Sequence, residues 1–195
     1  DRLARNIHDD ELKIAFAFLL SMPGAPFIYY GDEIGMRYVE NLVSVEGGYG
    51  RTGSRSPMQW DDGVNSGFST AASEKLYIPI DPAADRPTVQ AQISDENSLY
   101  NEIKRLIRIR REHPALLSRG EIEFVYAEKN EYPLAYVRSA GNEKILVVIN
   151  PAAREAAFGG DFSAAECIYS FGATAKIGGG KVLAAPMSAG FYLLK

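Results

Sequence analysis

The sequence GAPFIYYGDEIG at residues 24–35 decides how the rest of the chain is interpreted. Its short run of β-branched and aromatic residues is bracketed by Gly, Pro and Asp, which is the pattern of a buried strand between turns. We predict a strand over residues 26–30 that delivers its polar end, Asp32 and Glu33, to a face rich in loops. A second stretch, RSPMQWD at residues 55–61, follows within the same part of the chain.

The residues from Asp9 to just before Pro23 carry the signals of a helix. The acidic residues 9–11 place negative charge at the expected N-terminus, where the helix dipole favours it. Apolar residues then recur at helical spacing until Pro23 ends the pattern. The apolar stripe is so wide that we expect Phe16, Leu19, Leu20 and the following strand to need neighbours that cover them. Helix and strand together make half of a βαβ-type unit.

The region from residue 31 to residue 97 is rich in Gly, Ser, Asp and Pro and shows no sustained period. A loop of this length inside a compact domain is usually functional. It lacks the Gly-Lys-Ser/Thr ending of a phosphate-binding loop, which argues against nucleotide binding. A second helix is predicted to begin after Ser98, whose hydroxyl suits an N-terminal cap. The basic residues of this helix are interpreted as a solvated face.

After Pro114 the sequence pattern changes to short runs, either alternating or wholly apolar, that are separated by turn residues. The predicted strands cover residues 122–127, 134–138, 144–150, 167–171, 181–184 and 191–194. Their close spacing predicts a small antiparallel sandwich. Cys167 lies within one of these runs, so we interpret it as a buried, inert thiol. The chain is therefore divided into two predicted domains, residues 1–114 and 115–195.

Composition and charge argue against several classes of function. The formal net charge is −4, so no positive field would attract nucleic acid or an anionic membrane. The longest apolar stretch, residues 14–22, is far shorter than the roughly 20 residues of a membrane span. A single cysteine allows neither an internal disulfide nor a thiolate metal cluster, which suits a reducing compartment, and we expect the cytoplasm. We predict no cofactor and no metal site, and His8 and His113 lack the neighbours of a nucleophile pair.

Asp32 and Glu33 are the obvious candidates for a pair of catalytic carboxylates. Hydrolysis of a glycosidic bond with retention needs two carboxyl groups about 5 Å apart on opposite sides of that bond. Consecutive side chains that leave a strand point to opposite faces, so two sequence neighbours cannot easily straddle a sugar. We interpret both residues as structural.

The segment RTGSRSPMQWD at residues 51–61 carries a more specific signal. Guanidinium groups offer paired donors that suit neighbouring sugar hydroxyls, and a Trp ring can pack against the face of a pyranose. Arg51 and Arg55 are therefore candidate substrate-binding residues, although arginines in loops also have a purely structural role in holding the loop together. Trp60 is as well suited to supporting the loop from beneath as to touching a sugar.

Together, GAPFIYYGDEIG and RSPMQWD resemble the late part of the α-amylase superfamily, glycoside hydrolase family 13, and especially its branch of α-glucosidases, oligo-1,6-glucosidases and trehalose synthases. The resemblance implies an α/β plus all-β chain, namely the C-terminal part of a (β/α)8 TIM barrel followed by an antiparallel β-sandwich. It implies that Arg55 helps to hold the terminal glucose of an α-glucosidic oligosaccharide, with a weaker role for Arg51. It also implies that Asp32 and Glu33 order the barrel mouth and are not catalytic acids.

The same resemblance implies that the catalytic residues lie upstream of this chain. In the family, three catalytic carboxylates precede the present tract, and an arginine similar to Arg2 follows the last of them by three residues. We therefore expect a C-terminal fragment that is inactive by itself and whose partner is the missing N-terminal part of the barrel. The parent enzyme would hydrolyse α-glucosidic bonds with retention. Alternatives are a glucosyl isomerase or transferase of the trehalose synthase type and a non-catalytic amylase-like protein.

Overall fold

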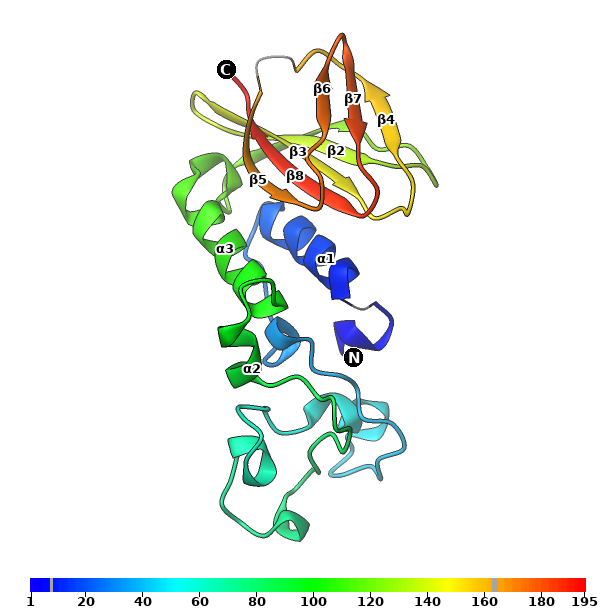
Figure 1. Ribbon diagram of the computed structural model, residues 1–195, viewed down its shortest axis with the longest axis vertical. Coiled ribbons are helices and arrows are strands. Elements are labelled where there is room, and N and C mark those ends of the chain that lie inside the picture. Colours follow the sequence, from blue (N-terminus) through cyan, green and yellow to red (C-terminus); the bar gives the residue numbers. More distant parts are fainter. Residues whose placement is uncertain (8, 163–164) are drawn as a thin grey trace. The chain divides into compact units, whose positions relative to one another are not determined.

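The computed structural model describes residues 1–7, 9–162 and 165–195, so His8 lies outside the described residues. The chain forms two compact units, and each unit draws on two segments. The first unit contains Asp1–Leu12 and Phe27–Ile103, and the second contains Lys13–Pro26 and Lys104–Lys195. Strands β1 to β8 all belong to the second unit, whereas the first consists mainly of loops and short helices (Figure 1). The domain division at residues 114 and 115 stays a prediction.

A five-stranded antiparallel sheet forms the larger layer of the second unit. Its strands, in spatial order, are β1 (Glu121–Tyr126), β2 (Leu134–Ala140), β3 (Glu143–Asn150), β8 (Ser188–Leu193) and β5 (Glu166–Phe171). β2 and β3 form a hairpin, and β8 pairs with β3 although it comes from the end of the chain. The sequence patterns predict all five strands, so this layer is confirmed.

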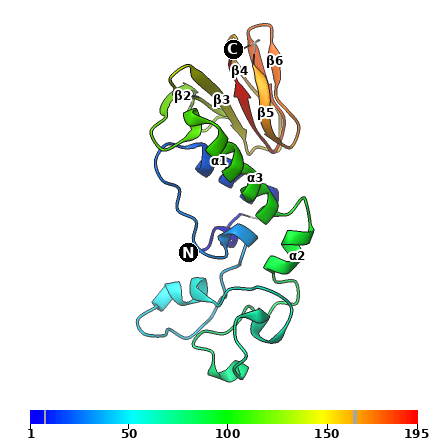
Figure 2. The ribbon, with the colours of Figure 1, turned by 90° about the vertical axis from the view of Figure 1, so that its left-hand side faces the viewer.

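A second antiparallel sheet has three strands, in the order β4 (Ala156–Gly159), β7 (Lys181–Ala184) and β6 (Lys176–Gly178). Side chains from both sheets share one apolar core, as in the contact of Leu146 with the cluster around Val182. The two layers, visible in Figure 2, confirm the predicted sandwich. β4 and β6 escape sequence analysis because runs of three or four residues are too short to show a period.

β3 is buried on both faces of its sheet, which explains its unbroken apolar run. Leu146 faces the three-stranded sheet, so the neighbouring Val147 must face the other side. On that other side Tyr136, the cross-strand partner of Val147, shares a 2.6 Å hydrogen bond with the hydroxyl of Ser21. Ser21 is the last residue of α1 (Asp9–Ser21), so the C-terminal turn of this predicted helix covers the second face.

The second predicted helix is α3 (Leu99–Glu112). The Ser98 hydroxyl accepts a hydrogen bond from the backbone N–H of Asn101 at 3.2 Å, which confirms the predicted cap. Arg110 of this helix is buried. Its guanidinium group donates to three carbonyl oxygens that follow α1 or belong to its end, those of Leu20, Met22 and Gly24, over 2.6, 2.8 and 2.7 Å. These bonds satisfy carbonyl groups that a helix end leaves without partners.

The described residues of the first unit contain no strand. Its elements are η1 (Leu3–Arg5), η2 (Asp32–Ile34), η3 (Tyr49–Arg55), η4 (Val64–Gly67), η5 (Ser73–Lys75) and α2 (Val89–Ser94), where η denotes a 3-10 helix. Another 3-10 helix, η6 (Pro114–Leu116), lies in the second unit. The Thr88 hydroxyl caps α2 by accepting from the N–H of Ala91 at 3.3 Å. The sequence does not predict α2, because six residues with mixed polarity show too little of the helical period.

The strand predicted over residues 26–30 is not formed, and that prediction was wrong. A strand needs a neighbour to complete its backbone hydrogen bonds, and none of the described strands pairs with this segment. Phe27 within it is 90% exposed, in line with an apolar segment that needs a cover. Phe16 and Leu20, which were expected to need the same cover, are instead buried by the chain itself.

The interpretation of Cys167 as a buried thiol was also wrong, because its side chain is exposed. β5, which carries it, is an edge strand of the five-stranded sheet. The pairing register shifts between Cys167 and Tyr169, and such a bulge breaks the regular alternation of inward and outward side chains. No helix in the described part of the chain is both long enough and apolar enough to span a lipid bilayer.

Candidate functional site

A tight turn at residues 31–35 positions the two neighbouring carboxylates. Its first and last residues are glycines with left-handed φ angles of 85° and 70°. An added Cβ at Gly31 would also collide with the side chain of Met36, so glycine alone satisfies both the backbone angle and the space. Consecutive side chains on the 3-10 helix between the glycines differ in direction by about 120°. Asp32 and Glu33 therefore leave the turn toward different surroundings.

Asp32 faces Arg2, which is 2% exposed. The Arg2 Nη1 atom donates to Asp32 Oδ1 at 3.2 Å and to the carbonyl oxygen of Tyr30. The same guanidinium group lies 4.7 Å from the ring centroids of both Tyr29 and Tyr30. Burial raises the pKa of Asp32 above its ordinary value, and the hydrogen bond and charge of Arg2 oppose that rise. Asp32 thus has a structural role, because its contact with Arg2 fixes the turn.

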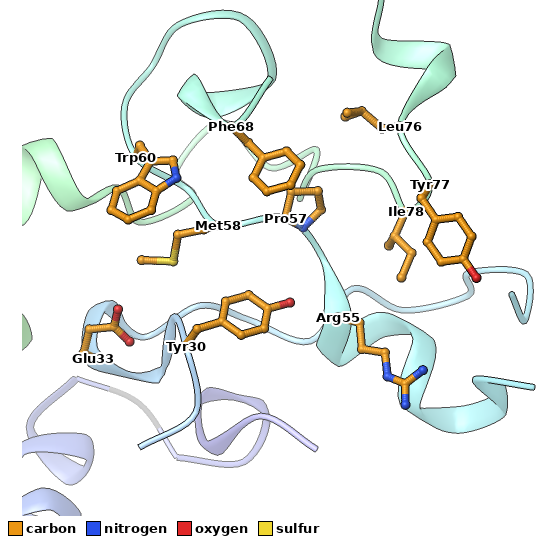
Figure 3. A pocket seen from close by; sticks show the side chains of 10 residues that line it. All are labelled: Tyr30, Glu33, Arg55, Pro57, Met58, Trp60, Phe68, Leu76, Tyr77 and Ile78. Carbon is orange, nitrogen blue, oxygen red and sulfur yellow. The ribbon is translucent and has the colours of Figure 1, made fainter. Parts of the chain in front are cut away.

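Glu33 instead borders a cavity of about 370 Å³. Its Oε2 atom is buried and has no hydrogen-bond partner among the described residues. Figure 3 shows its carboxylate at the same end of the cavity as Tyr30 and Met58. The two carboxylates that sequence analysis treats alike therefore differ, because Asp32 is paired with a buried arginine whereas the side chain of Glu33 lines a cavity.

The walls of this cavity are aromatic and aliphatic. The aromatic residues that line it are Tyr30, Trp60, Phe68 and Tyr77, and the aliphatic ones are Pro57, Met58, Leu76 and Ile78. Glu33 and Arg55 are the two lining residues that carry a charge. Apolar walls with a few polar groups of defined position are typical of small-molecule sites.

Arg55 and Arg51 have different positions relative to this cavity. Both belong to η3, and Arg55 lines the cavity whereas Arg51 is not among its lining residues. A 3-10 helix has three residues per turn, so side chains four positions apart differ in direction by about 120°. Both side chains are exposed, and the Arg55 guanidinium extends away from the Trp60 ring in Figure 3. The structure brings together Arg55 and Trp60 but leaves Arg51 outside.

Trp60 is held by backbone contacts and keeps its ring at the cavity. Its N–H donates to the carbonyl oxygen of Ser66 at 2.8 Å, and its own carbonyl accepts from the N–H of Gln90 at 2.9 Å. Ser66 lies in a turn where Asn65 and Ser66 have left-handed φ angles of 51° and 52°. Trp60 as a whole remains 50% exposed. Trp60 thus combines the two roles that the sequence left open, support of the loop and an available ring face.

Tyr30 links the turn to the RSPMQWD stretch. Its hydroxyl donates to the carbonyl oxygen of Ser56 at 2.9 Å. Burial, followed by the neighbouring Tyr29, raises the pKa of Tyr30 to about 12. The phenol is therefore protonated at neutral pH and keeps its role as a donor.

Sequence analysis assigned no role in the site to three aromatic residues of the cavity wall. Tyr30 was expected in a strand, and Phe68 and Tyr77 lie in the region of residues 31–97 that shows no sustained period. An exposed aromatic residue in a long loop is a weak signal, because many such residues are ordinary surface. Only the fold shows that these rings converge.

The remaining titratable groups offer no metal site within the described residues. No group of three or more His, Cys, Asp and Glu side chains there could hold a metal ion. The Nδ1 atom of His113 lies 2.9 Å from the Glu143 carboxylate, whose other oxygen accepts from the N–H of Ala115.

Comparison with known proteins gives a family and relatives. Residues 2–120 match the model of the α-amylase catalytic domain. The oligo-1,6-glucosidase of Parageobacillus thermoglucosidasius is 31% identical over 169 residues, which cover 72% of this chain and 29% of that protein. The trehalose synthase/amylase TreS of Mycobacterium tuberculosis is 38% identical over 150 residues, covering 73% of this chain and 23% of that protein.

The fold also matches solved structures. The crystal structure of the trehalulose synthase MutB from Pseudomonas mesoacidophila MX-45 superposes with a TM-score of 0.80 at 26% identity. The match covers 96% of this chain and 38% of that one. The chain thus spans about a quarter to two fifths of the length of the relatives it matches.

Proposed function

Because the chain belongs to the α-amylase family, we propose that it is the C-terminal part of an enzyme that acts on α-glucosidic bonds of short oligosaccharides. The observation that carries this proposal is the cavity, whose lining combines four aromatic residues with Arg55 and Glu33 within the segment that matches the family. Aromatic faces pack against the C–H face of a pyranose, and charged groups hydrogen-bond to its hydroxyls. The relative named oligo-1,6-glucosidase supports this substrate class.

The carboxylates that break the glycosidic bond are proposed to lie upstream of residues 1–195. Hydrolysis with retention uses two carboxyl groups about 5 Å apart, one as nucleophile and one as acid and base. Of the two acidic residues in the turn at residues 31–35, Asp32 is already paired with Arg2. The chain covers 29% and 23% of the length of two relatives, which leaves room in the full-length protein for further catalytic residues. We expect the 195-residue chain to have no glycosidase activity by itself.

Within the proposed site, Arg55 would contact the terminal glucose. Its side chain borders the cavity and offers a fork of N–H donors that can reach two adjacent hydroxyl oxygens. Arg51 is proposed to act only at the outer rim, since it does not line the cavity. The rest of the catalytic barrel is the proposed partner of residues 1–114, and the sandwich of residues 115–195 completes the chain.

A glucosyl isomerase or transferase is the second candidate function. It is favoured by the 38% identity to a trehalose synthase/amylase and by the structural match to a trehalulose synthase. Such an enzyme would use the same sugar contacts and differ in excluding water from the intermediate. Incubation of the full-length enzyme with maltose distinguishes the two, because hydrolysis releases glucose and isomerisation yields another disaccharide.

The sugar site is tested by comparing three arginine variants of the full-length enzyme. Arg55→Ala should raise KM for maltose about 10-fold to 100-fold, since hydrogen bonds to a charged group contribute about 1.5–3 kcal/mol. Arg51→Ala should change KM less than about threefold. Arg108→Ala, an exposed arginine on α3, is the control for a general loss of positive charge. Equal KM values for Arg55→Ala and the control would remove Arg55 from the site.

A further inference from the structure

Glu33 is a carboxylate to which the proposed function assigns no role of its own. Its side chain lines the cavity, and its Oε2 atom is buried without a hydrogen-bond partner among the described residues. A buried carboxylate oxygen that lacks a hydrogen bond carries a desolvation cost that its surroundings must offset. The turn that carries Glu33 is held by the backbone angle of Gly31 and by the Arg2 contact of Asp32. A carboxylate with unused capacity to accept hydrogen bonds therefore belongs to the cavity wall.

The surroundings restrict what can satisfy this acceptor. A carboxylate accepts hydrogen bonds, so the ligand must present a donor. Near it the walls are the ring of Tyr30, the thioether of Met58 and the ring of Trp60 (Figure 3). Such walls suit a ligand with an apolar face as well as hydroxyl groups, which is the chemistry of a pyranose. A volume of about 370 Å³ falls in the range of about 300–1,000 Å³ that is usual for small-molecule sites.

Glu33 and Arg55 recognise opposite features of a hydroxyl group. The guanidinium group only donates hydrogen bonds, so it can bind hydroxyl oxygens. The carboxylate only accepts hydrogen bonds, so it can bind the O–H groups of hydroxyls. We propose that Glu33 is a substrate-positioning residue, whose carboxylate accepts a hydrogen bond from one hydroxyl of the bound α-glucoside. This inference rests on the proposed sugar site. It assigns no catalytic step to Glu33 and no transfer of a proton.

The test uses the full-length enzyme with two matched substitutions. Glu33→Gln keeps the shape of the side chain and removes the charge of the acceptor, and Glu96→Gln makes the same change at an exposed position outside the cavity. Glu33→Gln should raise KM for maltose about tenfold and change kcat by less than twofold, with an unchanged melting temperature. The control should leave all three quantities unchanged. A fall in melting temperature with an unchanged KM would overturn the inference and make Glu33 a structural residue.

Substrates that lack one hydroxyl identify the contact directly. In a series of monodeoxy maltoses, wild-type enzyme should lose kcat/KM with the sugar whose missing hydroxyl contacts Glu33. Glu33→Gln should lose less than wild type with that same sugar, because the loss of charge has already weakened the contact. A constant ratio of wild type to Glu33→Gln across the whole series would overturn the inference.

Parallel measurement of Arg55→Ala separates this inference from the proposed function. If Arg55→Ala raises KM while Glu33→Gln does not, the sugar site stands and the role of Glu33 is refuted. If neither variant changes KM in an active enzyme, the cavity is not the sugar site and both proposals are overturned.

Discussion

Residues 27–98 and residues 121–193 follow two different structural principles. The later region is a sandwich in which backbone ladders pair the strands and one apolar core joins the sheets. The earlier region has loops and short helices, and its described residues contain no strand. There, individual polar side chains replace the repeating ladder. The stability of the sandwich therefore depends on many similar contacts, whereas the region around the candidate site depends on a few individual contacts.

Gln92 illustrates how the irregular region is held. Its Nε2 atom donates to the carbonyl oxygen of Ile34 at 2.8 Å, and its Oε1 atom accepts from the N–H of Tyr100 at 3.0 Å. One side chain thus ties the end of the turn at residues 31–35 to the start of α3. In a sandwich strand the same backbone groups would be paired with a neighbouring strand. Contacts of this kind can place a side chain where no regular element would.

The largest effect should come from the sandwich. Leu146 is fully buried in the shared core, so Leu146→Ala should lower the free energy of unfolding by about 2–5 kcal/mol. Leu117→Ala, at a position that is 41% exposed, is the matched control and should cost far less. Urea unfolding measures both values. Equal costs for the two variants would break the view that one shared core stabilises the sandwich.

The next effect separates backbone angle from available space in the turn at residues 31–35. Gly31 and Gly24 have nearly the same φ angle, +85° and +86°, but an added Cβ meets Met36 at Gly31 and nothing within 4 Å at Gly24. Gly31→Ala should cost about 2–4 kcal/mol, because the left-handed angle and the collision both count. Gly24→Ala should cost about 1–2 kcal/mol from the angle alone. Thermal unfolding of the two variants measures this difference, and equal costs would show that the turn can move to accept the methyl group.

The same contrast explains what the sequence could predict. β3 has an unbroken apolar run because both faces of its sheet are covered, and α1 and α3 show the helical period and a cap. These signals are local and repeat along the chain. The prediction of a strand over residues 26–30 was wrong because a strand depends on a partner that periodicity does not reveal. The prediction that Cys167 is buried was wrong because a bulge on an edge strand breaks the alternation from which its burial was inferred.

The candidate site was predicted only in part. The RSPMQWD stretch pointed to Arg55 and Trp60, which both line the cavity, although a role in binding sugar stays a prediction. The different surroundings of Asp32 and Glu33 were not predictable. They depend on Arg2, which lies about 30 residues earlier in the sequence, and on a turn whose direction is set by two glycines. Long-range contacts of single residues leave no period in a sequence.

A smaller effect should come from the Gln92 contacts. Gln92→Ala removes two hydrogen bonds to backbone groups and should cost about 1–3 kcal/mol. It should also raise KM, because the turn that carries Glu33 loses a support. Gln90→Ala in the same short helix is the matched control, since the Gln90 side chain is exposed. Melting temperature and maltose kinetics of the full-length enzyme report the two effects. If Gln92→Ala and Gln90→Ala behave alike, the irregular region does not depend on single side chains.

The smallest effect concerns pH and the contact of Asp32 with Arg2. Burial raises the pKa of Asp32 above its ordinary value despite the opposing hydrogen bond and charge of Arg2. A carboxyl group with a higher pKa in the folded state binds its proton more tightly there, so stability falls as pH rises through the window between the unfolded and folded pKa values. Asp32→Asn has no titrating group at this position, so it lacks this pH-dependent contribution to the free energy of unfolding. The free energy of unfolding of the variant, relative to wild type, should therefore rise with pH within that acidic window and stay constant above it. Urea unfolding at several pH values between about 3 and 7 measures this difference. A difference that falls with pH would mean that the Arg2 charge outweighs burial, and that this buried contact behaves like an ordinary stabilising ion pair.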